Sequence, residues 1–173
     1  NSGLIQWKDS LMPGNTKVKL KKIFAYNAQK KITNNFDVTE EINIEFEFFV
    51  QENNIQIASG LEISLASNPD FVIIKSISDY VKQKWGDQKP FNKGYYRSVC
   101  KIPSNLLGEG SILISLRIFS PPYAANLSEN VKLLHVLTLN ITDNFEQNSS
   151  RGSYPYELGN SLRPNLNWIT EKK

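Results

Sequence analysis

Residues 42–50 read INIEFEFFV, and apolar and polar side chains alternate along them with a period of two. Successive side chains of a β-strand point to opposite faces, so this pattern predicts a strand with one buried face. Residues 55–65, IQIASGLEISL, alternate in the same way, and the turn-forming sequence Glu52-Asn53-Asn54 lies between the two stretches. The two strands are therefore predicted to form a β-hairpin.

The remaining extended stretches complete an all-β pattern. Residues 95–102 and 111–120 are predicted to form a second hairpin around the turn at 103–110. In the second of these strands the inward positions hold Ile112, Ile114, Leu116 and Ile118, and the outward positions hold Leu113, Ser115, Arg117 and Phe119. Further strands are predicted at 17–26, 71–77 and 131–141, and a helical turn or two at 77–85.

The predicted fold is an antiparallel β-sandwich of about seven to nine strands, immunoglobulin-like or jelly-roll in its connections. We expect its core to contain Ile44, Phe46, Ile63, Ile114, Leu116 and Leu137. The stretch 131–141 has apolar residues on both faces, which indicates that both faces are covered or that one meets a partner.

The 173 residues fit one domain, which we divide into a sandwich at 1–144 and a C-terminal tail at 145–173. The tail does not alternate, yet it carries aromatic residues whose burial would be favourable. We expect it to dock on its own sandwich or on a partner's, with Arg151 and Arg163 fixing it by charge-assisted hydrogen bonds. A homodimer in which the tail takes part is the corresponding hypothesis.

Composition excludes several classes of function. The net charge of +3 is too small, without clustering, to indicate nucleic-acid binding. The sequence has no glycine-rich phosphate loop, and one cysteine with one histidine cannot form a multi-cysteine or histidine metal cluster. No apolar run approaches the length of a membrane-spanning helix. No cofactor and no metal are therefore expected.

The residues that could support catalysis lack partners. Cys100 is interpreted as a small buried residue, and His135 as a structural histidine in the apolar register of Leu133 and Leu137. Glu45 and Glu47 are two positions apart on one strand face, so their separation of roughly 6.5–7 Å would suit glycoside hydrolysis. A solvated strand face explains the same two residues, and we favour that interpretation.

Aromatic and planar polar residues remain as candidates for sugar binding, because sugar rings stack on aromatic faces and sugar hydroxyls need polar partners. Tyr95 and Arg97 share one predicted outer face, and Arg117 and Phe119 share another. The candidate carbohydrate-binding set is Trp85, Tyr95, Arg97, Arg117, Phe119 and Tyr123. Taken singly, each of these residues could instead cover the end of the sandwich.

Several motifs resemble one family in order along the chain. Trp7 is followed by PGN at 13–15; GYYRSVCKIPSNLL occupies 94–107 with Gly110 after it; RGSY lies at 151–154 and LRPNLNW at 162–168. This ordered set resembles the Wzt-type C-terminal domain of the ATP-binding subunit of bacterial O-antigen and other polysaccharide ABC transporters.

The resemblance implies a non-catalytic, cytoplasmic β-sandwich at the inner face of the bacterial inner membrane. Such a domain binds a lipid-linked polysaccharide of the O-antigen or lipopolysaccharide type and couples that binding to export. The implied partners are an ATPase domain preceding Asn1, the membrane subunit of the transporter and a second copy of the chain. Two alternatives stay open: an immunoglobulin-like domain that serves assembly only, and a jelly-roll glycoside hydrolase.

Overall fold

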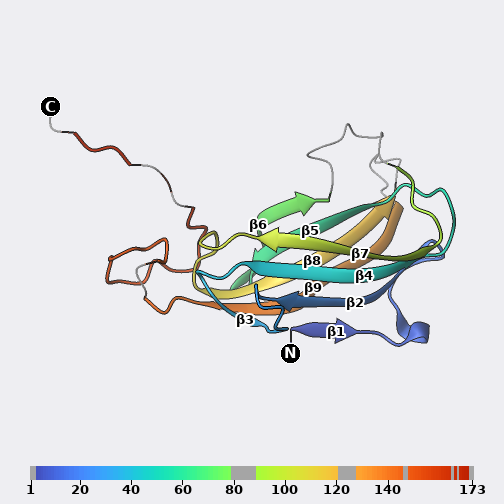
Figure 1. The fold of residues 1–173 in the computed structure, drawn as a ribbon, viewed down its shortest axis with the longest axis horizontal. Helices are drawn as coiled ribbons and strands as arrows, with labels where there is room; N and C mark the ends of the chain where they lie inside the picture. Colours follow the sequence, from blue (N-terminus) through green and yellow to red (C-terminus); the bar gives the residue numbers. More distant parts are fainter. Residues whose placement is uncertain are drawn as a thin grey trace.

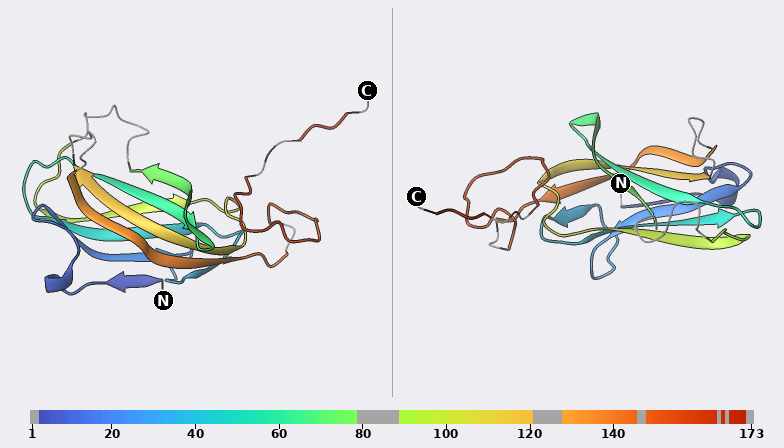
Figure 2. Two further views of the ribbon diagram at one scale, coloured as in Figure 1. Left: turned by 180° about the vertical axis from the view of Figure 1, so that it is seen from behind. Right: turned by 90° about the horizontal axis from the view of Figure 1, so that it is seen from above.

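Two β-sheets pack face to face in the computed structural model, which describes residues 3–78, 89–120, 128–145, 148–164, 166 and 168–171. The four-stranded sheet has the order β1-β2-β4-β7, and the five-stranded sheet has the order β3-β9-β8-β5-β6 (Figure 1). The right-hand view of Figure 2 shows the two layers edge-on. Within the described residues the protein is therefore an all-β sandwich, as predicted.

All strand pairs are antiparallel except β3 and β9, which run parallel. The four-stranded sheet consists of β1 (Leu4–Gln6), β2 (Val18–Tyr26), β4 (Ile42–Val50) and β7 (Gly94–Ile102). The five-stranded sheet consists of β3 (Asn35–Asp37), β9 (Ser128–Thr142), β8 (Gly110–Ser120), β5 (Ala58–Leu65) and β6 (Asn68–Ile77). A short 3-10 helix, η1 (Asp9–Leu11), follows β1.

Both predicted hairpins are wrong. β4 pairs with β2 and β7, whereas β5 lies in the other sheet and pairs with β6 and β8. The chain likewise crosses between sheets from β7 to β8. Alternation identifies the face that a strand buries, and both sheets bury a face in the same core, so the pattern cannot tell a hairpin from a crossover. The helical turns expected at 77–85 fall largely outside the described residues.

The predicted core is confirmed. The inward side chains of β4, β5, β8 and β9 meet between the sheets, and all six residues expected there are buried: Ile44, Phe46, Ile63, Ile114, Leu116 and Leu137. Ile112 and Ile118 are also buried, as the alternation of β8 predicts. The sandwich is thus held together by the strands whose period-two pattern is clearest.

The prediction that His135 lies in the apolar register of Leu133 and Leu137 is wrong. In the register of β8 and β9, Ile114 faces Leu137 and Leu116 faces Leu133, so three residues of β9 lie opposite Ser115 alone. His135 occupies this bulge with a φ of 53°, its backbone N–H donates to Ser115 Oγ at 2.9 Å, and its side chain is exposed. A bulge takes residues out of register, and regular alternation cannot reveal it.

The tail is linked to the sandwich through Asp143, which directly follows β9. Arg151 donates from Nε and Nη2 to the two carboxylate oxygens of Asp143, both at 3.0 Å, and Arg163 donates from Nη1 at 3.0 Å. Arg163 also lies 3.1 Å from a carboxylate oxygen of Glu109. The far part of the tail extends away from the sandwich (Figure 1), and Leu166, Trp168 and Ile169 are exposed there.

Candidate functional site on the four-stranded sheet

Strand β7 forms one edge of the four-stranded sheet and presents alternate side chains to solvent. Tyr95 and Arg97 are exposed on its outer side, followed by Val99 and Lys101, whereas Tyr96, Ser98 and Cys100 turn toward the other sheet. The Tyr95 residue is 68% exposed. Burial raises the pKa of the Cys100 thiol, so less of it is present as the nucleophilic thiolate.

Neighbouring strands add an aromatic ring and a cation beside Tyr95. Phe49 of β4 is the cross-strand partner of Tyr95, and their ring centroids are 4.7 Å apart. Lys21 of β2 places its Nζ 5.2 Å from the centroid of the Tyr95 ring. A shallow hollow of about 350 Å³ is lined by Lys21, Glu47, Tyr95, Tyr96 and Arg97. We call this region the Tyr95 face.

The two carboxylates of β4 beside this face are already engaged. Glu47 lies 2.9 Å from Nζ of Lys22. Glu45 is buried, accepts a hydrogen bond from the Tyr26 hydroxyl at 3.0 Å and lies 3.6 Å from Nη1 of Arg97. The expectation of a solvated face is thus wrong for Glu45, because β4 lies between β2 and β7 and their side chains cover it.

The second predicted pair, Arg117 and Phe119, lies on the outer face of the five-stranded sheet. Arg117 Nη1 is 2.7 Å from Glu129, and its Nε is 3.9 Å from Glu62. Phe119 is only 8% exposed, and its ring lies against Gly60 of the adjacent strand β5. These two side chains therefore do not join Tyr95 and Arg97 in one site.

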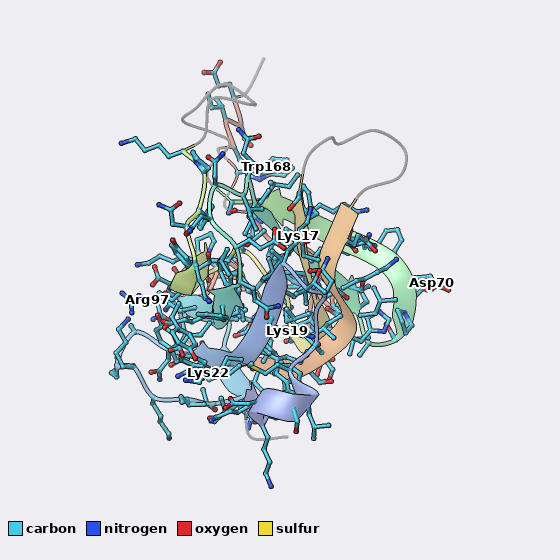
Figure 3. The ribbon with its side chains drawn as sticks, turned by 90° about the vertical axis from the view of Figure 1, so that its right-hand side faces the viewer. Lys17, Lys19, Lys22, Asp70, Arg97 and Trp168 are labelled. Atoms are coloured by element: carbon cyan, nitrogen blue, oxygen red, sulfur yellow. The ribbon has the colours of Figure 1, made fainter. Side chains whose placement is uncertain are left out.

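Figure 3 shows the separation of the two sides: Lys22 and Arg97 lie on one side of the molecule, and Asp70 of β6 lies on the opposite side. Of the six residues predicted from the sequence, Tyr95 and Arg97 are together on the Tyr95 face. Trp85 and Tyr123 lie outside the described residues. Whether any of the six binds a sugar stays a prediction.

Sequence reasoning missed Phe49 and Lys21. Phe49 carried a signal, because it is the single apolar residue at an outward position of INIEFEFFV. Lys21 carried none. A register shift between Leu20 and Lys22 places it, and such a bulge depends on the pairing of β2 with β4.

A polar second region lies at the end of the sandwich where β2 begins and β4 ends. Asn15 donates from its side chain to Asn130, which in turn donates to Ser120 at 2.7 Å. A hollow of about 460 Å³ there is lined by Lys17, Glu52, Asn53, Asn54, Ile55, Gln56, Pro90 and Ser120. Figure 3 views this end, with Lys17 and Lys19 labelled. None of the described residues lining this hollow is aromatic.

No family model and no curated protein matches the sequence. The structure does match a solved one, described as the crystal structure of the C-terminal domain of Wzt. The match has a TM-score of 0.71 at 10% sequence identity and covers 99% of this chain and 93% of that chain. This chain has the Wzt C-terminal fold. At such an identity, the likeness of the two structures concerns the fold alone.

The described residues contain no group of three or more His, Cys, Asp or Glu side chains placed to hold a metal ion. Over the same residues, no helix is long and apolar enough to cross a membrane.

Proposed function

We propose that this chain is a non-catalytic carbohydrate-binding domain that recognises an O-antigen-type polysaccharide at the Tyr95 face. The observation that carries the proposal is the exposed Tyr95 ring, paired with the half-buried Phe49 ring, beside Arg97 and Lys21 at a shallow hollow of the four-stranded sheet. Exposed aromatic surface bordered by polar groups is the usual mark of a binding site. The Wzt C-terminal fold supports this proposal.

An open sheet face limits the expected affinity. The hollow is shallow, so a sugar would be contacted from one side and would keep much of its hydration. We expect a dissociation constant in the high-micromolar to millimolar range for one domain, and stronger apparent binding when two copies engage one polysaccharide.

The test is a binding measurement on an array of bacterial O-antigen polysaccharides, with two matched variants. Tyr95→Ala is expected to weaken binding about tenfold through the lost stacking. Tyr156→Ala is the control, since Tyr156 in the tail is 67% exposed, nearly the same as Tyr95. An array that stays blank at millimolar ligand would instead favour a domain that serves assembly only.

Hydrolysis of a bound glycan is the second outcome that would overturn the proposal. The candidate catalytic carboxylates are Glu45 and Glu47, and each already has a protein partner. We therefore expect no release of reducing sugar. Release that disappears in Glu45→Gln or Glu47→Gln would assign the chain to the glycoside hydrolases.

The wider proposal places the domain in a polysaccharide ABC transporter at the cytoplasmic side of the inner membrane. Its partners would be an ATPase domain of the same polypeptide, the membrane subunit and a second copy of the chain. The exposed Leu166, Trp168 and Ile169 at the end of the tail support the homodimer, because apolar side chains of this size favour a covering partner.

Light scattering on the full chain and on a variant lacking residues 166–173 tests the homodimer. The shorter chain keeps Arg151 and Arg163 on Asp143, so the sandwich should remain folded. We expect a dimer that becomes a monomer on truncation. A monomer in both cases would contradict the proposed role of the tail.

A further inference from the structure

The charges on the Tyr95 face are not balanced locally. Glu47 is paired with Lys22 at 2.9 Å, and Glu41 lies 3.5 Å from Lys101. Arg97 approaches Glu45 only at 3.6 Å, beyond hydrogen-bond distance, and its side chain is 73% exposed. Among the described residues, no carboxylate pairs with Nζ of Lys21, which lies over Tyr95 instead. Two cations therefore remain available at the hollow.

On the outer face of the five-stranded sheet, three cations each lie closer to a carboxylate than Arg97 does. Lys75 is 3.2 Å from Glu62, Arg117 is 2.7 Å from Glu129, and Lys132 is 3.5 Å from Glu129. The Arg97 side chain is also 73% exposed, against 28% for Arg117, so the Tyr95 face offers the more accessible guanidinium.

The position of the two cations matches a charged sugar. Both line the same hollow as Tyr95: Lys21 has its Nζ over the ring, and Arg97 is two positions along β7, roughly 6.5–7 Å away by strand rise. A pyranose ring lying on Tyr95 would carry its exocyclic substituent to the rim of the hollow, within reach of both groups. A guanidinium fork and an ammonium are the donors that proteins use for carboxylate and phosphate oxygens.

We propose that the glycan recognised at the Tyr95 face is acidic, with a carboxylate or phosphate group that accepts hydrogen bonds from Arg97 and Lys21 while its sugar ring stacks on Tyr95. This inference rests on the proposed function and adds the chemical class of the sugar. The carboxylates of β4 have other partners as well: Glu47 pairs with Lys22, and Glu45 accepts a hydrogen bond from Tyr26 while lying 3.6 Å from Arg97.

The experiment is a titration of the ¹⁵N-labelled full chain with glucose, glucuronate and glucose 6-phosphate, followed by amide shifts on β4 and β7. These probes share one pyranose ring and differ at C6, which carries a hydroxymethyl group, a carboxylate or a phosphate ester. We expect the acidic sugars to shift the Tyr95 face and to bind at least about threefold more tightly than glucose. Raising the salt concentration should weaken their binding and leave glucose unaffected.

Variants assign the effect to the two cations. Arg97→Ala and Lys21→Ala should each lower the affinity for the acidic sugars by roughly three- to tenfold. Lys132→Ala, which removes an ion-paired lysine from the five-stranded sheet, is the control and should leave their affinity unchanged. The stronger of the two acidic probes identifies the group as a carboxylate or a phosphate.

Failure of this inference differs from failure of the proposed function. Equal binding of glucose and both acidic sugars on β4 and β7, insensitive to salt, would overturn the acidic class and leave sugar binding in place. Tight acidic binding that persists in both cation variants would also overturn it. If none of the three sugars shifted this face at 50 mM, roughly the weakest range expected for a single stacked ring, both proposals would fail.

Discussion

Each sheet carries an arginine and an aromatic residue two positions apart on its outer face, and the two pairs have different environments. Tyr95 and Arg97 lie on β7, where the tyrosine is 68% exposed and the arginine side chain 73%. Phe119 and Arg117 lie on β8, where the corresponding values are 8% and 28%. Because the residue types are alike, the difference in exposure must come from the surroundings of the two strands.

The position of the strand in its sheet explains the difference. β7 is an edge strand with β4 on one side, whereas β8 lies between β9 and β5 and is flanked on both. Cross-strand neighbours therefore cover β8: Gly60 leaves room for the Phe119 ring, and Glu129 pairs with Arg117. The edge strand keeps its arginine and its ring accessible, as a binding surface requires.

The largest effect is expected at Asp143, because this carboxylate binds two buried arginines, Arg151 and Arg163. Its side chain is fully buried and accepts hydrogen bonds from both Arg151 and Arg163. Asp143→Asn leaves the buried Arg151 without its countercharge and Arg163 with Glu109 alone, so we expect Tm to fall by at least about 5 °C. Calorimetry measures the fall, and Asp70→Asn, on the exposed strand β6, should leave Tm unchanged.

The pH dependence of this contact has a definite sign. Hydrogen bonds from Arg151 hold the pKa of Asp143 well below its usual range. A carboxyl with a lowered folded pKa stabilises the native state above its unfolded pKa of about 3.9, and this stabilisation is lost as the pH falls through the folded pKa. The difference in Tm between the wild type and Asp143→Asn should therefore shrink below about pH 4. A constant difference down to pH 2 would contradict the assignment.

The next largest effect is the difference in stability loss between Phe119→Ala and Tyr95→Ala. Phe119→Ala removes a covered ring and should lower the free energy of unfolding by about 2–4 kcal/mol. Tyr95→Ala removes a largely exposed ring, so we expect a loss below about 1 kcal/mol. Urea denaturation followed by tryptophan fluorescence measures both. Similar losses for the two variants would mean that the edge position of β7 does not set the environment of Tyr95.

The sequence predicted these environments only in part. The alternation in 42–50 and 111–120 identified the buried faces correctly, because period two is a local property of one strand. It could not identify which strands pair, and so it could not distinguish the edge strand β7 from the interior strand β8. Tyr95 and Arg97 therefore looked equivalent to Phe119 and Arg117 in the sequence.

Long-range pairing accounts for the other differences. His135 is exposed because three residues of β9 oppose Ser115, and Lys21 reaches Tyr95 because β2 bulges against β4. Both features depend on how two strands are aligned, which no single strand encodes. Phe49 is the exception. Its outward position follows from the alternation, and only its pairing with Tyr95 depends on how β4 and β7 are aligned.

The smallest expected effect compares the two arginines by double-mutant cycles. Arg117 and Glu129 are hydrogen-bonded at 2.7 Å and about three-quarters covered, so their coupling should be about 1 kcal/mol in the free energy of unfolding. Arg97 and Glu45 are 3.6 Å apart, and the exposed guanidinium stays hydrated, so we expect less than about 0.5 kcal/mol. Salt should reduce the smaller coupling further, because mobile ions screen the exposed guanidinium. A coupling for Arg97 and Glu45 as large as that for Arg117 and Glu129 would show that Arg97 is committed to the sandwich. It would then be unavailable to an acidic sugar, and the Tyr95 face would resemble the face of the five-stranded sheet.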